Sequence, residues 1–118
     1  MAQTPEGKVK AGVRKYLVSL GIRPAGGKLP PVEVTGWFYF PMQNGMGVSG
    51  IPDIVGCYKG KFFAIETKAP GKRNNTSANQ KLRIAEIQAA GGAVLVADGV
   101  EDVRRYFEEV FGLRDQQT

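Results

Sequence analysis

Residues 50–68 read "GIPDIVGCYKGKFFAIETK", and this stretch decides the fold. It contains two β-rich runs, 51–58 and 61–68, which are joined at Lys59-Gly60. Two strand-like runs separated by two residues of this kind predict a β-hairpin with a tight turn. In such a hairpin Tyr58 faces Lys61, and this one pair sets the register of every other pair. A four-residue loop would keep the same register, whereas a three- or five-residue loop would break it.

In this register Asp53 and Glu66 lie directly opposite one another, with their β-carbons roughly 4.5 to 5.5 Å apart. Lys68 lies two residues beyond Glu66 and therefore shares their face of the sheet. Two facing carboxylates repel each other, and one lysine offsets only part of that repulsion. Burying an unpaired charge costs several kcal/mol or more, so a compensating charge is expected at this place.

A divalent cation such as Mg²⁺ or Mn²⁺ can supply that charge, because these hard ions bind carboxylate, carbonyl and water oxygens. A metal ion held by Asp53 and Glu66, with Lys68 beside it, suits hydrolysis of a phosphodiester. The alternative is that the two acids are edge-strand charges that discourage aggregation and that Lys68 is their salt-bridge partner. The shared face favours the metal site.

The composition excludes several other kinds of chemistry. The chain has no histidine and a single cysteine, Cys57. Histidine-dependent nucleophiles, histidine-ligated zinc and intrachain disulfides are therefore excluded, and a reducing cytosolic location is expected. The polar opening "MAQTPEGKVKAG" predicts no secretory signal, and no long apolar run predicts a membrane span.

Basic residues gather in two segments of a chain whose net charge is +5. Residues 1–28 carry six basic side chains against one acid, and residues 59–83 carry seven against Glu66 alone. Residues 84–118 carry seven acids against three arginines. The two basic segments would suit a polyanion such as nucleic acid, although a merely uneven surface explains the charge equally well.

The rest of the chain predicts one domain, 1–118, with the element order αβββαβα around a mixed sheet. Thr4 and Pro5 predict the start of a helix that ends at Gly21, followed by a loop over 22–33 and an aromatic strand over 35–42 that Pro41 ends or confines to an edge. Ser77 predicts the cap of a helix that reaches Gly91-Gly92, and "AVLVA" predicts a buried parallel strand. Residues 98–112 predict a closing helix whose inward-facing apolar residues are Val103, Tyr106, Phe107 and Val110. Trp37 and Cys57 are interpreted as core residues, because apolar strand residues usually pack inside.

Pro52-Asp53, followed by Glu66-Thr67-Lys68, resembles the PD-(D/E)xK nuclease motif, and the predicted element order is similar to the core of that superfamily. More narrowly, "GVSGIPDIVG" and "FFAIETKAPGKRNNTSANQ" resemble the VRR-Nuc domain in the stand-alone form found in phage and bacteria. The resemblance covers most of the chain, and it implies a cytoplasmic location in a bacterial or phage-infected host cell.

The resemblance implies a role for each matching residue. Asp53, Glu66 and the carbonyl of Thr67 would bind Mg²⁺ or Mn²⁺, and Lys68 would be the catalytic lysine. Glu6 would complete the site from the first helix, although it could equally be a first-turn acid that favours the helix dipole. Gln80 would also belong to the site, although Ser77 to Gln80 fits a capping box as well.

The segments beside the site are expected to contact DNA. Lys72, Arg73, Asn74 and Asn75 form a basic loop that would hold phosphates, with an ordinary solvated loop as the alternative. Ser49 and Gly50 would let the DNA backbone approach the metal, unless the glycine only serves a tight turn.

These expectations define a metal-dependent, structure-selective DNA endonuclease, in its most specific form a Holliday junction resolvase acting as a homodimer. Two alternatives remain: a nuclease for flaps or nicks without junction preference, and a nucleic-acid-binding module without catalysis. The aromatic run "GWFYF" could form part of a dimer interface, but core packing is the preferred interpretation.

Overall fold

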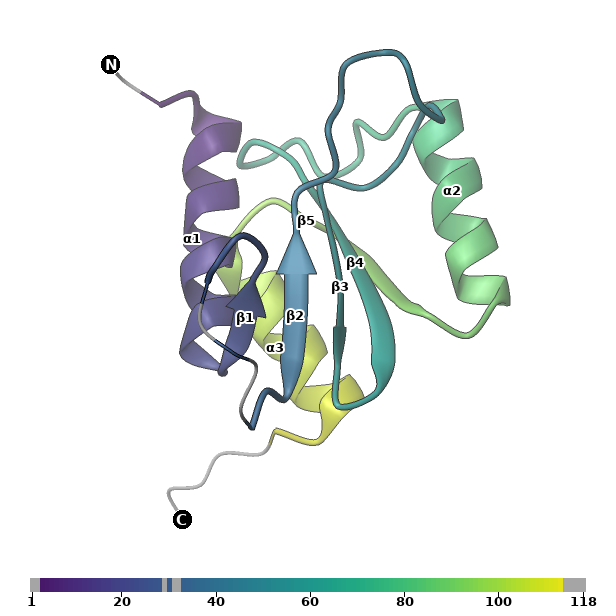
Figure 1. Ribbon diagram of the computed structural model, residues 1–118. Helices are drawn as coiled ribbons and strands as arrows, with labels where there is room; N and C mark the ends of the chain where they lie inside the picture. The colour runs from purple at the N-terminus through teal and green to yellow at the C-terminus, as the bar shows by residue number, and fades with distance from the viewer. Residues whose placement is uncertain (1–2, 29, 31–32, 114–118) are drawn as a thin grey trace.

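The computed structural model describes residues 3–28, 30 and 33–113 of the chain. Its elements are α1 (Pro5–Ser19), β1 (Ile22–Pro24), β2 (Gly36–Tyr39), β3 (Ile54–Tyr58), β4 (Lys61–Thr67), α2 (Ala78–Ala89), β5 (Ala93–Ala97) and α3 (Val100–Phe111). The chain folds as an α/β domain in which one mixed sheet separates the helices (Figure 1).

The five strands lie in chain order across the sheet, from β1 to β5. β2, β3 and β4 form an antiparallel meander, and the two outer strands pair in parallel, β1 with β2 and β5 with β4. The parallel pairing predicted for "AVLVA" is confirmed. The connection from β4 to β5 contains α2. The helix therefore begins at the end of the sheet where β4 finishes.

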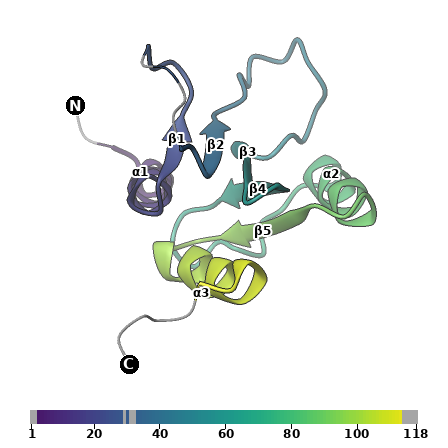
Figure 2. The same cartoon turned by 60° about the horizontal axis from the view of Figure 1, so that its bottom comes forward.

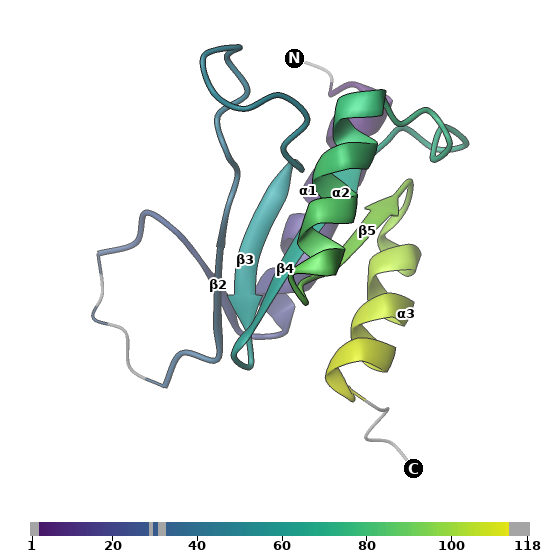
Figure 3. The ribbon, with the colours of Figure 1, turned by 90° about the vertical axis from the view of Figure 1, so that its right-hand side faces the viewer.

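Two helices cover one face of the sheet and one helix covers part of the other. Figure 2 shows α1 and α3 together against one face, and Figure 3 shows α2 on the other side, next to β4 and β5. The part of the second face formed by β2 and β3 has no helix over it. None of the three helices in the described part of the chain is long and apolar enough to cross a membrane.

The core lies between the sheet and the α1–α3 layer. α1 contributes three buried residues at 3.6-type spacing, Val9, Val13 and Leu17, and α3 contributes Val103 and Phe107. These meet inward-facing strand residues, each 0% exposed: Phe38, Ile54, Phe63 and Ile65. This apolar contact fixes the sheet against α1 and α3.

The predicted start of the first helix is confirmed. The Thr4 hydroxyl accepts a hydrogen bond from the Gly7 amide at 3.0 Å, and Pro5 is the first helical residue. The helix ends at Ser19, two residues before the predicted stop at Gly21, whose φ of 84° suits glycine. The first helix thus lies within the predicted range.

The predicted hairpin turn is also confirmed, and it yields a stability prediction. Tyr58 faces Lys61, and both turn residues have positive φ, 52° at Lys59 and 81° at Gly60, as a type I′ turn requires. Gly60→Ala is expected to lower the free energy of unfolding by about 1 kcal/mol, because an L-residue resists this backbone conformation. Urea denaturation measures the change.

Gly47→Ala is the matched control for that experiment. An added β-carbon meets nothing within 4 Å at either glycine, but Gly47 has no positive φ. Its substitution is therefore expected to change stability by only a few tenths of a kcal/mol. Equal effects of the two substitutions would contradict the assigned turn.

Two expectations about strand boundaries were wrong. The predicted loop 22–33 contains a strand, β1, in which Ile22 pairs with Gly36 and is 1% exposed. The expected strand 51–58 begins only at Ile54, so Asp53 stands at the entrance of the strand and not inside it. In both places pairing with β2 or β4 decides the boundary, and local composition does not show that pairing.

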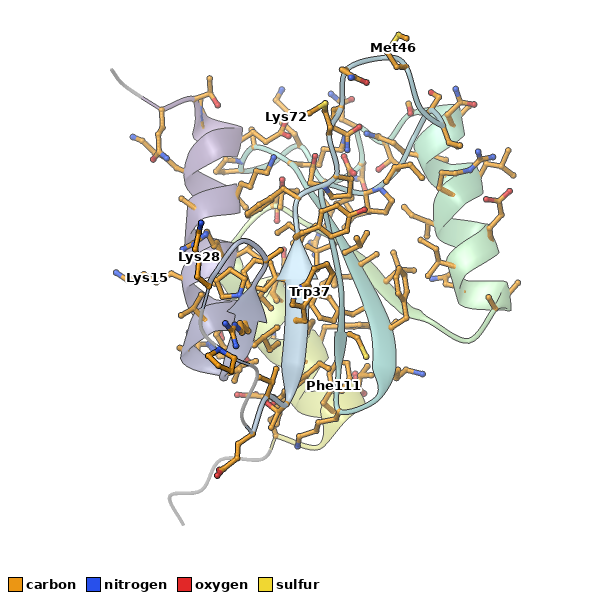
Figure 4. All side chains as sticks on the ribbon, in the orientation of Figure 1. Lys15, Lys28, Trp37, Met46, Lys72 and Phe111 are labelled. Carbon is orange, nitrogen blue, oxygen red and sulfur yellow. The ribbon has the colours of Figure 1, made fainter. Side chains whose placement is uncertain are left out.

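The interpretation of Trp37 and Cys57 as core residues was also wrong. Trp37 is 45% exposed, and its cross-strand partner Cys57 is exposed too. Both alternate with buried residues and point to the second face, where β2 and β3 lack a helix. Figure 4 shows Trp37 in front of the sheet on that open face.

Candidate metal and nucleic-acid site

The candidate site lies where β3 begins, β4 ends and α2 starts. The predicted hairpin register is confirmed up to the pair Ile54 and Ile65. The ladder stops there, one pair short of Asp53 and Glu66, and the Asp53 carboxylate binds Thr67. Its Oδ2 accepts hydrogen bonds from the Thr67 amide at 2.8 Å and from the Thr67 hydroxyl at 2.9 Å. The end of β4 thus holds Asp53 in a fixed orientation.

Glu66, Lys68 and Gln80 form a compact polar network beside Asp53. Glu66 is 3% exposed, and its Oε2 accepts a hydrogen bond from Gln80 Nε2 at 2.8 Å. Lys68 Nζ lies 3.5 Å from the same Oε2 and donates to Gln80 Oε1 at 3.0 Å. Glu66 and Lys68 therefore point to the same side of the sheet, as their spacing predicted.

Burial and a neighbouring charge shift the ionisation of Glu66. Desolvation raises its pKa most, and the negative charge of Asp53 raises it further, to about 7. The charge and hydrogen bond of Lys68 counteract this rise only in part. The Asp53 charge thus lies close enough to oppose ionisation of Glu66, and this repulsion between two carboxylates is the conflict that the sequence predicted.

Gln80 completes the predicted capping box and also contacts Glu66 and Lys68, while its role in catalysis stays a prediction. It is the third helical residue of a complete capping box, in which its amide N–H donates to the Ser77 hydroxyl and its side chain accepts from the Ser77 amide. The same side chain also joins Glu66 to Lys68. The start of α2 therefore orients the site directly.

Glu6 lies in the first turn of α1, where the helix dipole favours an acid. Its charge contributes to the raised pKa of Glu66, but less than Asp53 does. Within residues 3–28, 30 and 33–113, no group of three or more histidine, cysteine, aspartate or glutamate side chains is arranged to hold a metal ion. The carboxylate pair is therefore the acidic part of the site, and ligation by Glu6 stays a prediction, as does ligation by the Thr67 carbonyl.

The basic loop after β4 is fastened to the start of α3. The Gly71 amide donates to Asp98 Oδ2 at 2.9 Å, which lowers the pKa of Asp98, and Arg73 pairs with Asp102 at 3.2 Å. Lys72, Asn74 and Asn75 are exposed. Arg73 thus has an internal partner, whereas the Lys72 ammonium makes no ion pair with any described residue.

Ser49 and Gly50 pack against the first turn of α2. Asn79 Nδ2 donates to the Ser49 hydroxyl at 2.9 Å. Gly50 has a φ of 85°, and a β-carbon there would lie 2.4 Å from the Asn79 carbonyl. Both the turn and this close approach explain the glycine, so contact of these residues with DNA stays a prediction.

Sequence reasoning missed the two acids that anchor the basic loop, Asp98 and Asp102. Their signal was present: the acids in "ADGVED" follow a buried strand, and the carboxyl ends of neighbouring parallel strands lie at one edge of a sheet. It also missed Tyr39, which is 43% exposed on the open face.

No protein-family model matches the chain, and no curated protein or solved structure is significantly similar to it. The VRR-Nuc resemblance therefore stays a prediction from sequence motifs.

Proposed function

We propose that this protein is a divalent-metal-dependent, structure-selective DNA endonuclease, in its most specific form a Holliday junction resolvase that acts as a homodimer. One observation carries the proposal: the charge of the half-buried Asp53 opposes ionisation of the buried Glu66, beside a lysine ammonium that lies 3.5 Å from Glu66. Structural salt bridges pair unlike charges, whereas this arrangement keeps two acids together.

The donor set fits Mg²⁺ or Mn²⁺. Among the described residues, every hydrogen bond to the pair uses Asp53 Oδ2 or Glu66 Oε2, so Asp53 Oδ1 and Glu66 Oε1 accept none. Magnesium sites in nucleotide-processing proteins commonly use one or two carboxylates and complete the shell with water and substrate phosphates. A bound ion would polarise the phosphodiester and lower the pKa of a water molecule.

Lys68 is placed to stabilise the charge that develops on the phosphoryl oxygens. Its Nζ is held by Gln80 and by Glu66, and its side chain is 13% exposed, so the ammonium lies in a partly desolvated position. Fixed donors in such positions contribute strongly to catalysis because they need no reorganisation during the reaction. Gln80 acts as a positioning residue, because it fixes both Lys68 and Glu66 from the start of α2.

Two-fold symmetric junctions are cut most simply by a two-fold dimer, and this symmetry argument supports the homodimer in the proposal. Light scattering at assay concentrations tests it, with a dimer as the expected result. A monomer that still makes paired incisions would contradict the homodimer.

One cleavage experiment tests the proposal. Purified protein is incubated with a labelled four-way junction, a flap and a linear duplex, each with Mg²⁺, with Mn²⁺ and with EDTA. Metal-dependent cleavage of the junction in preference to the duplex is expected. Cleavage of flaps alone would support the flap nuclease instead, and binding of all three substrates without cleavage would leave only the binding module.

Lys72→Ala is expected to weaken DNA binding on every substrate and to reduce the slope of log K against log salt by about 0.9, the value for one lost phosphate contact. Lys15→Ala, an exposed lysine on α1, removes the same charge far from the site; Figure 4 shows Lys72 and Lys15 in different parts of the molecule. Fluorescence anisotropy at several salt concentrations measures both variants. An equal slope for wild type and Lys72→Ala would show that Lys72 makes no phosphate contact and would contradict a role of the basic loop in DNA binding.

A further inference from the structure

The segment between β2 and β3 encloses an open hollow of about 580 Å³. Tyr39 from β2 lines the hollow, together with residues from both arms of the segment: Pro41, Met42, Val48, Ser49 and Ile51. The volume lies in the range of small-molecule sites. Figure 1 shows this segment standing over the end of the sheet beside the start of α2.

The hollow is adjacent to the candidate metal site. Tyr39 pairs with Val55, which lies only two residues after Asp53 in the chain. On the other arm, Gly50 lies directly against the backbone of Asn79 and Gln80. A DNA strand with one phosphodiester at Asp53 and Glu66 would therefore pass the mouth of the hollow with the next nucleotide.

The lining has the chemistry that a nucleobase requires. Among the described residues, no charged side chain lines the hollow, so it offers phosphate no counter-charge. Tyr39 presents a ring that is 43% exposed, and Met42 and Val48 present apolar side chains that are 80% and 62% exposed. Trp37 lies beside Tyr39, with ring centroids 5.5 Å apart, and extends the aromatic surface across the sheet. Uncharged aromatic surfaces next to phosphate-binding groups are typical of sites that stack unpaired bases.

We propose that this hollow receives an unpaired nucleobase from the strand whose phosphodiester lies at Asp53 and Glu66, with the base stacked on Tyr39. The inference rests on the proposed function and narrows its substrate class to DNA with unpaired nucleotides next to the cut. A paired base enters less readily, because it must first be unstacked and unpaired at a cost of a few kcal/mol. Base stacking would thus explain why the aromatic residues on this face of β2 are exposed, which core packing does not.

Trp37 provides a test that does not require catalysis, because it is the only tryptophan of the chain and lies next to Tyr39. Tryptophan fluorescence is titrated in EDTA with a twelve-nucleotide oligothymidylate and with a duplex of the same length. Quenching by the single strand is expected. Tyr39→Leu is expected to weaken single-strand binding about tenfold and duplex binding less than twofold, judged from the midpoints.

Phe62→Leu is the matched control, because Phe62 is 44% exposed on the same sheet face but does not line the hollow. It is expected to bind both DNAs as the wild type does. Equal weakening by the two substitutions, or no effect of Tyr39→Leu, would overturn the inference. Sedimentation without DNA adds a further check: if Tyr39→Leu dissociates a wild-type dimer and leaves single-strand binding unchanged, the face takes a second copy and the inference fails.

The cleavage panel separates this inference from the proposed function. If wild type cleaves DNA and Tyr39→Leu retains the same preference for branched over duplex substrates, only the hollow is refuted. If wild type cleaves nothing, the nuclease proposal fails, while the fluorescence titration still decides whether the hollow binds a base.

Discussion

Lys68→Met is expected to lower the rate of DNA cleavage by about 10²- to 10³-fold, the loss typical for removal of one charge-stabilising donor. The long side chain keeps most of the packing, so the loss reports the ammonium. DNA affinity is expected to change less than threefold, because the interaction strengthens only in the transition state. Single-turnover cleavage and anisotropy measure the two quantities separately.

Lys61→Met is the control for this substitution. Lys61 is an exposed lysine of the same strand, β4, and its Nζ donates to the Gly91 carbonyl at the far end of the hairpin. It is expected to cleave DNA at the wild-type rate. If wild type and Lys68→Met are equally slow while both bind DNA, the catalytic role of the lysine is refuted.

Glu66→Gln is expected to stabilise the metal-free protein at pH 8 by about 2 to 3 kcal/mol. The folded protein raises the Glu66 pKa from 4.5 to about 7, so it disfavours the charged form. Below pH 4.5 the group is protonated in both states and costs nothing. As the pH rises from 4.5 to 7, the folded wild type loses stability progressively, and above pH 7 the loss is constant. The variant lacks this loss.

Urea denaturation in EDTA at pH 4 and pH 8 measures the difference. Glu86→Gln removes an exposed carboxylate from α2 and controls for the change in net charge. Excess Mn²⁺ at pH 8 is expected to stabilise wild type and to narrow its gap to Glu66→Gln, because an ion that binds only the folded state stabilises it by mass action. If the difference in free energy of unfolding between Glu66→Gln and wild type were the same at pH 4 and pH 8, the raised pKa of Glu66 would be contradicted. No stabilisation by Mn²⁺ would count against the metal site.

The spacing in residues 50–68 was sufficient to predict how Glu66 and Lys68 lie. The turn residues Lys59 and Gly60 have few conformations available, and the alternation of strand side chains then assigns each residue to a face. The alternation was not sufficient to predict the contacts of Asp53, because Asp53 lies beyond the last ladder pair and its carboxylate binds the Thr67 amide. The orientation of a side chain at the end of a strand depends on its hydrogen-bonding partners, which the alternation does not specify.

Gln80 shows why the two interpretations of one residue need not exclude each other. Its amide group has a donor and an acceptor, so the acceptor can serve Ser77 and Lys68 while the donor serves Glu66. The capping pattern was visible in the sequence. The contact with β4 was not, because it depends on where α2 lies relative to the sheet.

The sequence by itself determined the local features: the first helix with its Thr4 cap, the hairpin with its register, the capping box of α2, and the two-residue alternation along the strands. Each depends on residues within a few positions of one another, so short-range sterics and hydrogen bonding are sufficient. Only the tertiary structure decided the pairing of β1 and which face of β2 is open. Trp37 and Phe38 are both apolar, and the side on which α1 and α3 pack makes Phe38 core and leaves Trp37 exposed.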